Sequence, residues 1–150
     1  MHSIDRLFGQ ANQARRDGRY AEARTSLDAL ILIARRQAND ILWAQALTVK
    51  AQVECDDDHA VAAVPLYEEA VKLYRQTSDV LALASTLRHL GDTYQTCEEY
   101  DEASSRYEEA LTIYQAVGDE VEDASPTPDN DLRQALAQCR NAWTYPDQAS

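Results

Sequence analysis

Residues 81–119, LALASTLRHLGDTYQTCEEYDEASSRYEEALTIYQAVGD, contain two segments with the apolar period of an amphipathic helix. The first segment places apolar or small residues at Leu81, Ala84, Leu87, Gly91 and Tyr94. The second places them at Tyr100, Ala103, Tyr107, Ala110, Leu111 and Tyr114. Gly118 follows, where a left-handed residue often ends a helix. The stretch therefore predicts two helices joined by a short turn at residues 97–99.

The same spacing recurs twice upstream, at an interval of 40 residues. The sequence YEEA at residues 107–110 is repeated at residues 67–70, and Asp119 corresponds to Asp79 and Asn39. A period between 20 and 50 residues indicates stacked units, none of which can bury its apolar face alone. We therefore predict an all-α solenoid of three helix pairs.

Each predicted pair combines small residues with one large residue. Helices approach to about 8–10 Å where the contact side chains are small, and large side chains then fill the space beside them. The small positions are Ala11, Ala51 and Gly91 on the first helices and Ala23, Ala63 and Ala103 on the second. The large positions are Leu27, Tyr67 and Tyr107.

The predicted boundaries form one domain over residues 1–150. Repeat 1 covers about 4–39, repeat 2 about 41–79 with Asp40 as its helix cap, and repeat 3 about 80–119. A linker is expected at 120–130, a capping helix at about 131–144 and a frayed tail at 145–150. The last helix carries an apolar stripe at Leu132, Leu136, Cys139 and Trp143. Its cap is expected at Asn130 or Asp131, and the alternative is that it is the first helix of a lost fourth repeat.

Pro65 lies inside the pattern of the second helix of repeat 2, where it lacks an N–H group and would clash with the preceding turn. The helix either begins near Ala62, with Pro65 in its first turn, or is kinked. We favour the late start.

Composition limits the function. The chain has a net charge of −12, with seven basic and five acidic residues in 1–40 but two basic and nine acidic residues in 81–120. This balance repels a phosphate backbone, so no nucleic-acid partner is expected. No apolar run reaches the roughly 20 residues of a membrane span, and the N-terminus lacks a signal-peptide core. Three cysteines without CxxC spacing suit a reducing compartment, and we expect a cytoplasmic protein without membrane partners.

The sequence offers little for catalysis. Cys55–His59, CDDDH, is the one compact set of metal-ligand types, but consecutive residues seldom converge on one ion. His89 is the one histidine that could meet Cys55 across neighbouring helices. There is no glycine-rich phosphate loop. We therefore predict no catalytic residues, no metal, no cofactor and no enzyme.

The segment Leu87–Tyr94 followed by Ala103–Tyr107 resembles the tetratricopeptide repeat signature, with Leu87 in place of its usual tryptophan. The resemblance weakens upstream, where Lys50 and Glu54 replace Leu90 and Tyr94. The 40-residue period is similar to the long-helix repeats of kinesin light chains and some bacterial regulators. It implies a right-handed superhelix whose first helices line a concave groove that binds proteins or peptides.

The residue that follows each packing position is rotated by about 100° around the helix axis. Such residues are expected to line that groove. They are Phe8, Asn12, Arg15, Gln45, Thr48, Gln52, Ser85, Arg88, Asp92 and Gln95. Amides and arginines can hydrogen-bond a peptide backbone or a carboxylate. Phe8 and Val49 stand where relatives that clamp a C-terminal carboxylate carry Lys and Asn, so that activity is not expected.

The sequence thus predicts a non-catalytic interaction scaffold that binds a protein or peptide partner in the groove. The first alternative is a homo-oligomer that self-associates head to tail or through the convex face, with the basic first repeat against the acidic third repeat of a neighbour. The second alternative is a regulatory array that is fused to, or acts on, an ATPase or a transcription factor, as the family resemblance implies.

Overall fold

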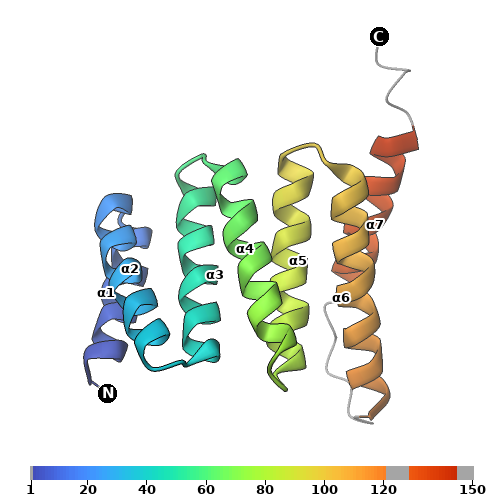
Figure 1. Cartoon of the computed structure of the whole chain (residues 1–150). Helices are drawn as coiled ribbons and strands as arrows, with labels where there is room; N and C mark the ends of the chain where they lie inside the picture. The colour runs from blue at the N-terminus through green and yellow to red at the C-terminus, as the bar shows by residue number, and fades with distance from the viewer. Residues whose placement is uncertain (1, 121–128, 145–150) are drawn as a thin grey trace. The chain divides into compact units, whose positions relative to one another are not determined.

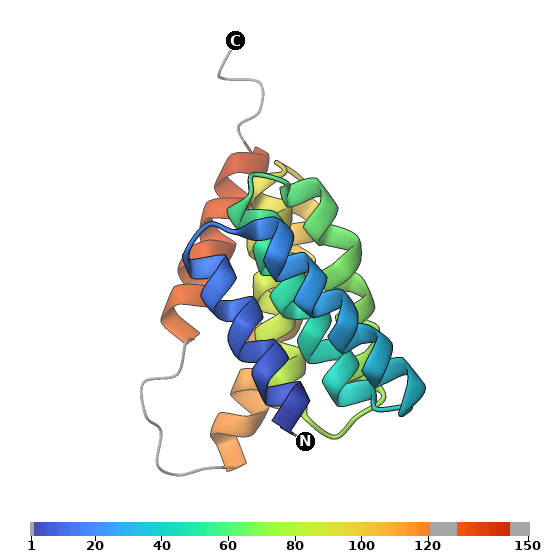
Figure 2. The same cartoon turned by 90° about the vertical axis from the view of Figure 1, so that its left-hand side faces the viewer.

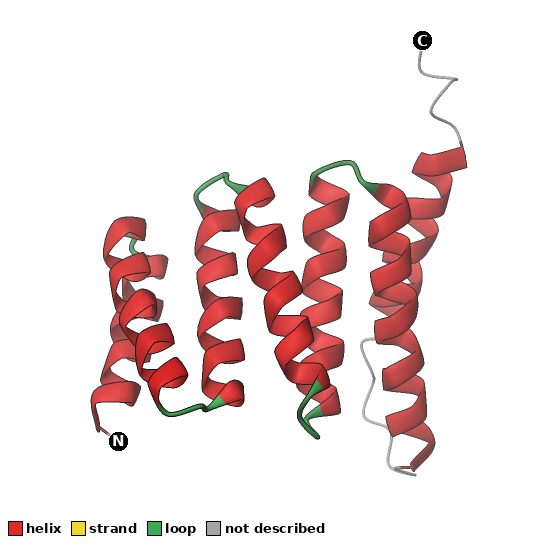
Figure 3. Ribbon diagram, in the orientation of Figure 1, coloured by secondary structure: helices red, strands yellow, loops and turns green. Residues whose placement is uncertain are grey.

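The structure, a computed structural model, describes the backbone of residues 2–120 and 129–144 and the side chains of residues 3–118 and 132–140. The described residues are helical apart from short turns (Figures 1 and 3). The helices are α1 His2–Arg16, α2 Tyr20–Arg36, α3 Asp40–Asp56, α4 Ala60–Arg75, α5 Val80–Thr96, α6 Tyr100–Glu120 and α7 Asp129–Thr144. They form two compact units, Met1–Ser78 and Asp79–Ser150.

Within each unit the helices pack in chain order. In the first unit α1 packs on α2, α2 on α3 and α3 on α4, while in the second unit α5 packs on α6 and α6 on α7. Figure 2 shows α1 and α2 side by side and antiparallel. Helix α7 packs on α6. This confirms the all-α fold of sequential helix pairs.

The helix ends repeat with half the predicted period. Helices α2, α3, α4, α5 and α6 begin at residues 20, 40, 60, 80 and 100. In the three-residue turns the second residue has a positive φ: Gly18 (77°), Ala38 (51°), Asp58 (59°) and Glu98 (62°). The N–H of the next residue donates to a carbonyl five residues earlier, at N···O distances of 2.7 to 2.9 Å. This is the Schellman arrangement, which satisfies free carbonyls at a helix end.

Two predicted helix ends are wrong. Asn39, not Asp40, caps α3, because its side-chain oxygen accepts from the N–H of Leu42 at 3.1 Å. Gly118 does not end α6, which continues to Glu120 with no positive φ at the glycine. Local sequence favours a stop at Gly118, but a glycine also fits inside a helix at a cost of about 1 kcal/mol.

The late start of α4 is also wrong. The helix begins at Ala60, so Pro65 lies beyond its first turn. The carbonyl of His59 receives the N–H groups of Ala62 and Ala63, at 3.0 and 3.3 Å, and this holds the first turn together upstream of the proline.

Helix α7 begins at Asp129, before both residues expected to cap it. Three members of its predicted stripe, Leu132, Leu136 and Cys139, are buried, which confirms the stripe. The side chain of Trp143, most of the predicted linker and the predicted tail lie outside the described residues.

The core of the first unit forms where α1, α2 and α3 meet. Its buried members are Ala11, Ala14, Ala23, Leu27, Leu30, Ala34, Leu42, Ala46 and Val53. The small positions predicted on both helices of each repeat are buried, including Ala51, Ala63 and Ala103 at 0% exposure. Small residues therefore mark the helix contacts, as predicted.

In the second unit the ring of Tyr107 on α6 fills the space beside Gly91 on α5. A Cβ atom at Gly91 would lie only 2.7 Å from Cε1 of that ring, and Tyr107 is fully buried. Leu81 does not join this packing, contrary to the predicted stripe, because it is 50% exposed; Leu83 and Leu90 are buried instead.

Candidate partner-binding surface

Four predicted site residues form a row along one face of α5. Ser85, Arg88, Asp92 and Gln95 follow one another at steps of three or four residues, and we call them the α5 polar row. Asp92 is exposed and the other three are partly exposed. An amide, a hydroxyl, a guanidinium and a carboxylate therefore lie together on an accessible helix face.

Two tyrosine hydroxyls from α6 reach this row. Tyr107 donates a hydrogen bond to the carboxylate of Asp92, and the amide oxygen of Gln95 lies 3.1 Å from the same hydroxyl. Burial, followed by the hydrogen bond to Asp92, raises the pKa of Tyr107. Burial also raises the pKa of Tyr114, and the charge of Arg88 and the nearby Ser85 side chain oppose that rise.

The tyrosine pattern predicted packing positions and not these hydroxyl contacts. A helical stripe shows that a ring faces the neighbouring helix, but it does not show which polar side chain its hydroxyl meets. The signal that could have found the contact is the position of Asp92 next to Gly91, because the space left by the glycine brings the Tyr107 hydroxyl to the next residue on α5.

Cys139 of α7 lies close to the same cluster. Burial first, and then the charge of Asp92, raises the pKa of its thiol, and a hydrogen bond with the Ser104 side chain opposes the rise. The thiol is fully buried and stays protonated at neutral pH. Its role here is packing between α6 and α7.

In the first unit, α3 carries three of the predicted residues. Gln45 is exposed, and Thr48 and Gln52 are partly exposed. The Thr48 hydroxyl donates to the backbone carbonyl of Gln45 at 2.7 Å, which leaves its oxygen lone pairs as acceptors. These three residues share amide and hydroxyl groups with the α5 polar row but include no charged side chain.

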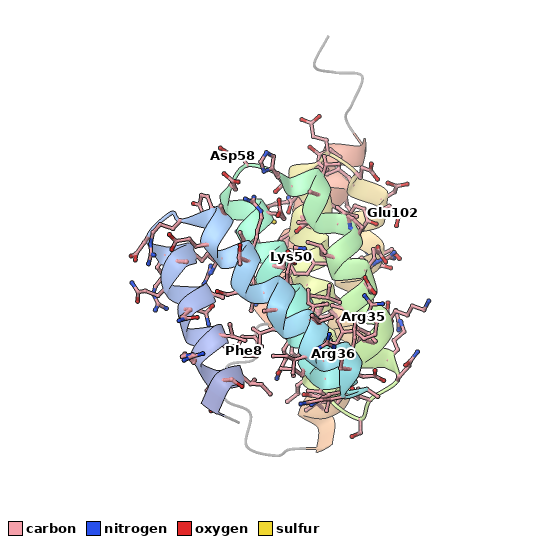
Figure 4. All side chains as sticks on the ribbon, turned by 60° about the vertical axis from the view of Figure 1, so that its left-hand side comes forward. Phe8, Arg35, Arg36, Lys50, Asp58 and Glu102 are labelled. Carbon is pink, nitrogen blue, oxygen red and sulfur yellow. The ribbon has the colours of Figure 1, made fainter. Side chains whose placement is uncertain are left out.

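The predicted residues of α1 lie differently from the expectation. Phe8, expected to line the groove, is partly buried and packs against the core of the first unit (Figure 4). Arg15 bridges to α3, with its Nη1 3.2 Å from Oδ2 of Asp56. Its Nε is a buried donor without a hydrogen-bond partner among the described residues. Asn12 is partly exposed between them.

The CDDDH turn is part of an ion network that joins α2 to α3. Arg24 places Nε 2.6 Å from Oε1 of Glu54 and Nη2 2.6 Å from Oδ2 of Asp57. The hydrogen bond from Arg24 lowers the pKa of Asp57. His59 lies 3.4 Å from Asp57 through Nδ1. The guanidinium of Arg24 therefore pairs with two carboxylates. The described side chains contain no cluster of three or more ligand-type residues placed to hold a metal ion.

The cysteine and histidine considered as a catalytic pair lie in different units. Cys55 belongs to the first unit and His89 to the second. No helix within residues 2–120 and 129–144 is long and apolar enough to cross a membrane. Helix pairs joined by recurring turns, with polar rows on the first helices, define a helical-repeat protein.

Comparison with known proteins identifies the repeat. Residues 44–116 match the tetratricopeptide repeat family. Together with the packing of successive helix pairs, this match identifies residues 44–116 as tetratricopeptide repeats. No curated protein matches the sequence.

Solved structures share the fold. BtubC (BKLC) of P. vanneervenii superimposes with a TM-score of 0.76 and 19% identity over 89% of this chain, which spans 54% of the BtubC chain. A putative kinesin light chain protein of Podosopora anserina with nearly identical TPR-like repeats gives a TM-score of 0.76 and 18% identity, covering 96% of this chain and 70% of that one. A point variant of that protein gives a TM-score of 0.74 and 18% identity, covering 93% of this chain and 66% of that one. The likeness to kinesin light chain-type repeats, expected from the 40-residue period, is confirmed for the fold.

Proposed function

We propose that the chain is a non-catalytic scaffold that binds an extended peptide segment of a partner protein along its first helices. Tetratricopeptide repeat domains in general mediate contacts between proteins, and the α5 polar row is the observation that carries the proposal for this surface. Its side chains offer donors and acceptors in a regular line, and two tyrosine hydroxyls add to them.

The side chains of the row suit a peptide ligand. Arg88 can pair with a carboxylate, and the Gln95 amide can hydrogen-bond a peptide backbone group. The partly exposed Thr48 and Gln52 offer the same chemistry on α3. Arg15 on α1 is partly exposed, but its Nε is buried and its Nη1 is already paired with Asp56. Phe8 contributes packing, and we place it outside the contact surface.

A quantitative pull-down from lysate tests the proposal with the variant Gln52→Glu/Arg88→Glu. The matched control is Gln10→Glu/Arg36→Glu, which makes the same charge change at exposed positions of α1 and α2. We expect the first variant to lose partners that the intact chain and the control retain. Equal capture by both variants would contradict binding at this surface.

Self-association is the second candidate, since residues 1–40 are net basic and residues 81–120 strongly acidic. Opposite charges steer association, and low salt strengthens that effect. Light scattering at low salt separates the two functions. A mass above that of one chain, lost at high salt, would favour head-to-tail assembly over a foreign partner.

A further inference from the structure

Helix α7 lies on α6 in the way that α3 lies on α2. The buried residues Leu132, Leu136 and Cys139 of α7 have the spacing i, i+4, i+7. The side chains of α3 that face α1 and α2 have the same spacing, at Leu42, Ala46 and Val49. The two helices can therefore be aligned residue by residue.

Two ion pairs support this alignment independently. Lys50 Nζ lies 2.7 Å from Oδ1 of Asp28, which links α3 to α2. Arg140 Nη2 lies 2.9 Å from Oε1 of Glu108, which links α7 to α6. Asp28 and Glu108 occupy the same repeat position, two 40-residue periods apart, and Lys50 and Arg140 occupy matching positions in the aligned helices. Helix α7 is thus placed as the first helix of a further helix pair.

In the first unit α4 covers one face of α3, whereas the matching face of α7 in the second unit is exposed. In the first unit α4 packs on α3, and Ala44 and Leu47 are buried at 0% and 3% exposure. The matching residues of α7 are Gln134 and Ala137, which are both exposed among the described side chains. The face of α7 that corresponds to the α4-binding face of α3 is therefore exposed.

This exposed region of the second unit is concave. A groove of about 450 Å³ lies between α6 and α7. Its lining residues are Leu111, Leu136, Ala137, Arg133 and Arg140. Arg133 and Arg140 are two turns apart on α7, so both lie on the same side of an apolar floor.

We propose that the groove between α6 and α7 binds an amphipathic helix of a partner protein that carries carboxylates beside its apolar stripe. A helix fits because a helix takes the matching place in the first unit, and docking of an apolar helix face into a groove is a common mode of recognition. Carboxylates fit because a guanidinium pairs with them in two-point geometry.

The ion pair between Arg140 and Glu108 does not oppose this binding. The pair with Glu108 is exposed, with 63% and 55% of the two side chains accessible. Such surface pairs contribute about 0–1 kcal/mol, so Arg140 can take up a carboxylate of the ligand at little cost. This site is separate from the α5 polar row, and either can fail without the other.

The probe is a synthetic peptide with the sequence of residues 100–120, an acidic amphipathic helix with six acidic residues and one basic residue. Fluorescence anisotropy on the full chain measures its affinity, and amide NMR shifts locate it. We expect saturable binding with shifts at Leu136 and Arg140. The variant Arg133→Glu/Arg140→Glu should weaken binding about tenfold or more, since it replaces attraction with repulsion at both arginine positions.

Three controls sharpen the test. Arg6→Glu/Arg36→Glu makes the same charge change at exposed positions of α1 and α2 and should bind like the intact chain. Ala137→Trp, which fills the groove without a change of charge, should also weaken binding. A scrambled peptide of equal composition should not bind.

Several results would overturn the proposal. These are no saturable binding, equal affinity of the two arginine variants, or equal binding of the scrambled peptide. Shifts at Gly91 would mean that the peptide replaces α6 itself. A dimer of the free chain that Arg133→Glu/Arg140→Glu disperses would assign the groove to a second copy.

Discussion

Tyr107 on α6 packs its ring against Gly91 on α5 so closely that a Cβ atom at the glycine would lie 2.7 Å from Cε1 and 2.8 Å from Cδ1. The ring is fully buried and its hydroxyl donates to Asp92, one residue beyond the glycine. The same contact therefore sets the approach of two helices and places a polar group in the α5 polar row. Packing and candidate function are linked at this point.

The glycine is expected to be essential to this packing. Gly91→Ala should lower the free energy of unfolding by about 1–3 kcal/mol, because the buried ring has to shift from a close-packed position. Gly9→Ala in α1 is the matched control, since a Cβ there meets nothing within 4 Å. It should raise stability by up to about 1 kcal/mol through helix propensity. Urea unfolding measures both, and a stabilised Gly91→Ala would contradict the contact.

The ion network of Arg24 is expected to contribute more than the neighbouring pair of Lys50. Arg24→Met leaves the carboxylate of Glu54, a residue only 9% exposed, without its main partner and should cost about 2–3 kcal/mol. Lys50→Met breaks a pair whose Asp28 side chain is 59% exposed and should cost less than about 1 kcal/mol. Equal losses in denaturant unfolding would show that burial of Glu54 does not matter.

The left-handed turn residues predict a stabilising substitution. Ala38 has a φ of 51°, a conformation that costs a residue with a Cβ about 1–2 kcal/mol. Ala38→Gly should therefore stabilise the chain by about 0.5–1 kcal/mol after the entropy of glycine is counted. The reverse change, Gly18→Ala at a φ of 77°, should destabilise it. Thermal unfolding with the same sign for both variants would contradict this account of the turns.

Tyr107 also predicts a dependence of stability on pH. Burial raises its pKa above the ordinary value of 10.0, so the folded chain keeps a proton that the unfolded chain loses. The contribution of this group is fully present below pH 10 and falls as the pH rises further. Tyr107→Phe removes this ionisable hydroxyl. The difference in free energy of unfolding between the intact chain and the variant should therefore shrink from about pH 8 to about pH 10.5. A constant difference in urea unfolding would argue against a protonated, buried hydroxyl.

Much of the fold is predictable, because packing repeats at a fixed interval in the sequence. The small residues at Ala11, Ala51 and Gly91 and the stripe of Leu132, Leu136 and Cys139 all follow from that interval and from helical spacing. Helix ends are less predictable. Non-glycine residues such as Asp58 and Glu98 take the left-handed position, while Gly118 remains inside a helix.

The departures from the repeat signature have a structural reason that the sequence does not reveal. Lys50 and Glu54 replace Leu90 and Tyr94, and in the structure they pair with Asp28 and Arg24 on α2. Such partners lie 22 and 30 residues away, beyond the reach of a periodic pattern within one helix. The hydroxyl contacts of the α5 polar row also join different helices, and helical spacing alone does not predict them.

Site-specific photo-crosslinking in lysate tests the central claim, that partners bind along the first helices, most directly. A photoreactive residue replaces Gln45 or Gln52 on α3, and matched sites are Glu69 on α4 and Thr112 on α6, both exposed. We predict specific crosslinks from the two α3 positions and none from the matched sites. Crosslinks only from Glu69 and Thr112 would contradict the claim and move the binding surface to the second helices.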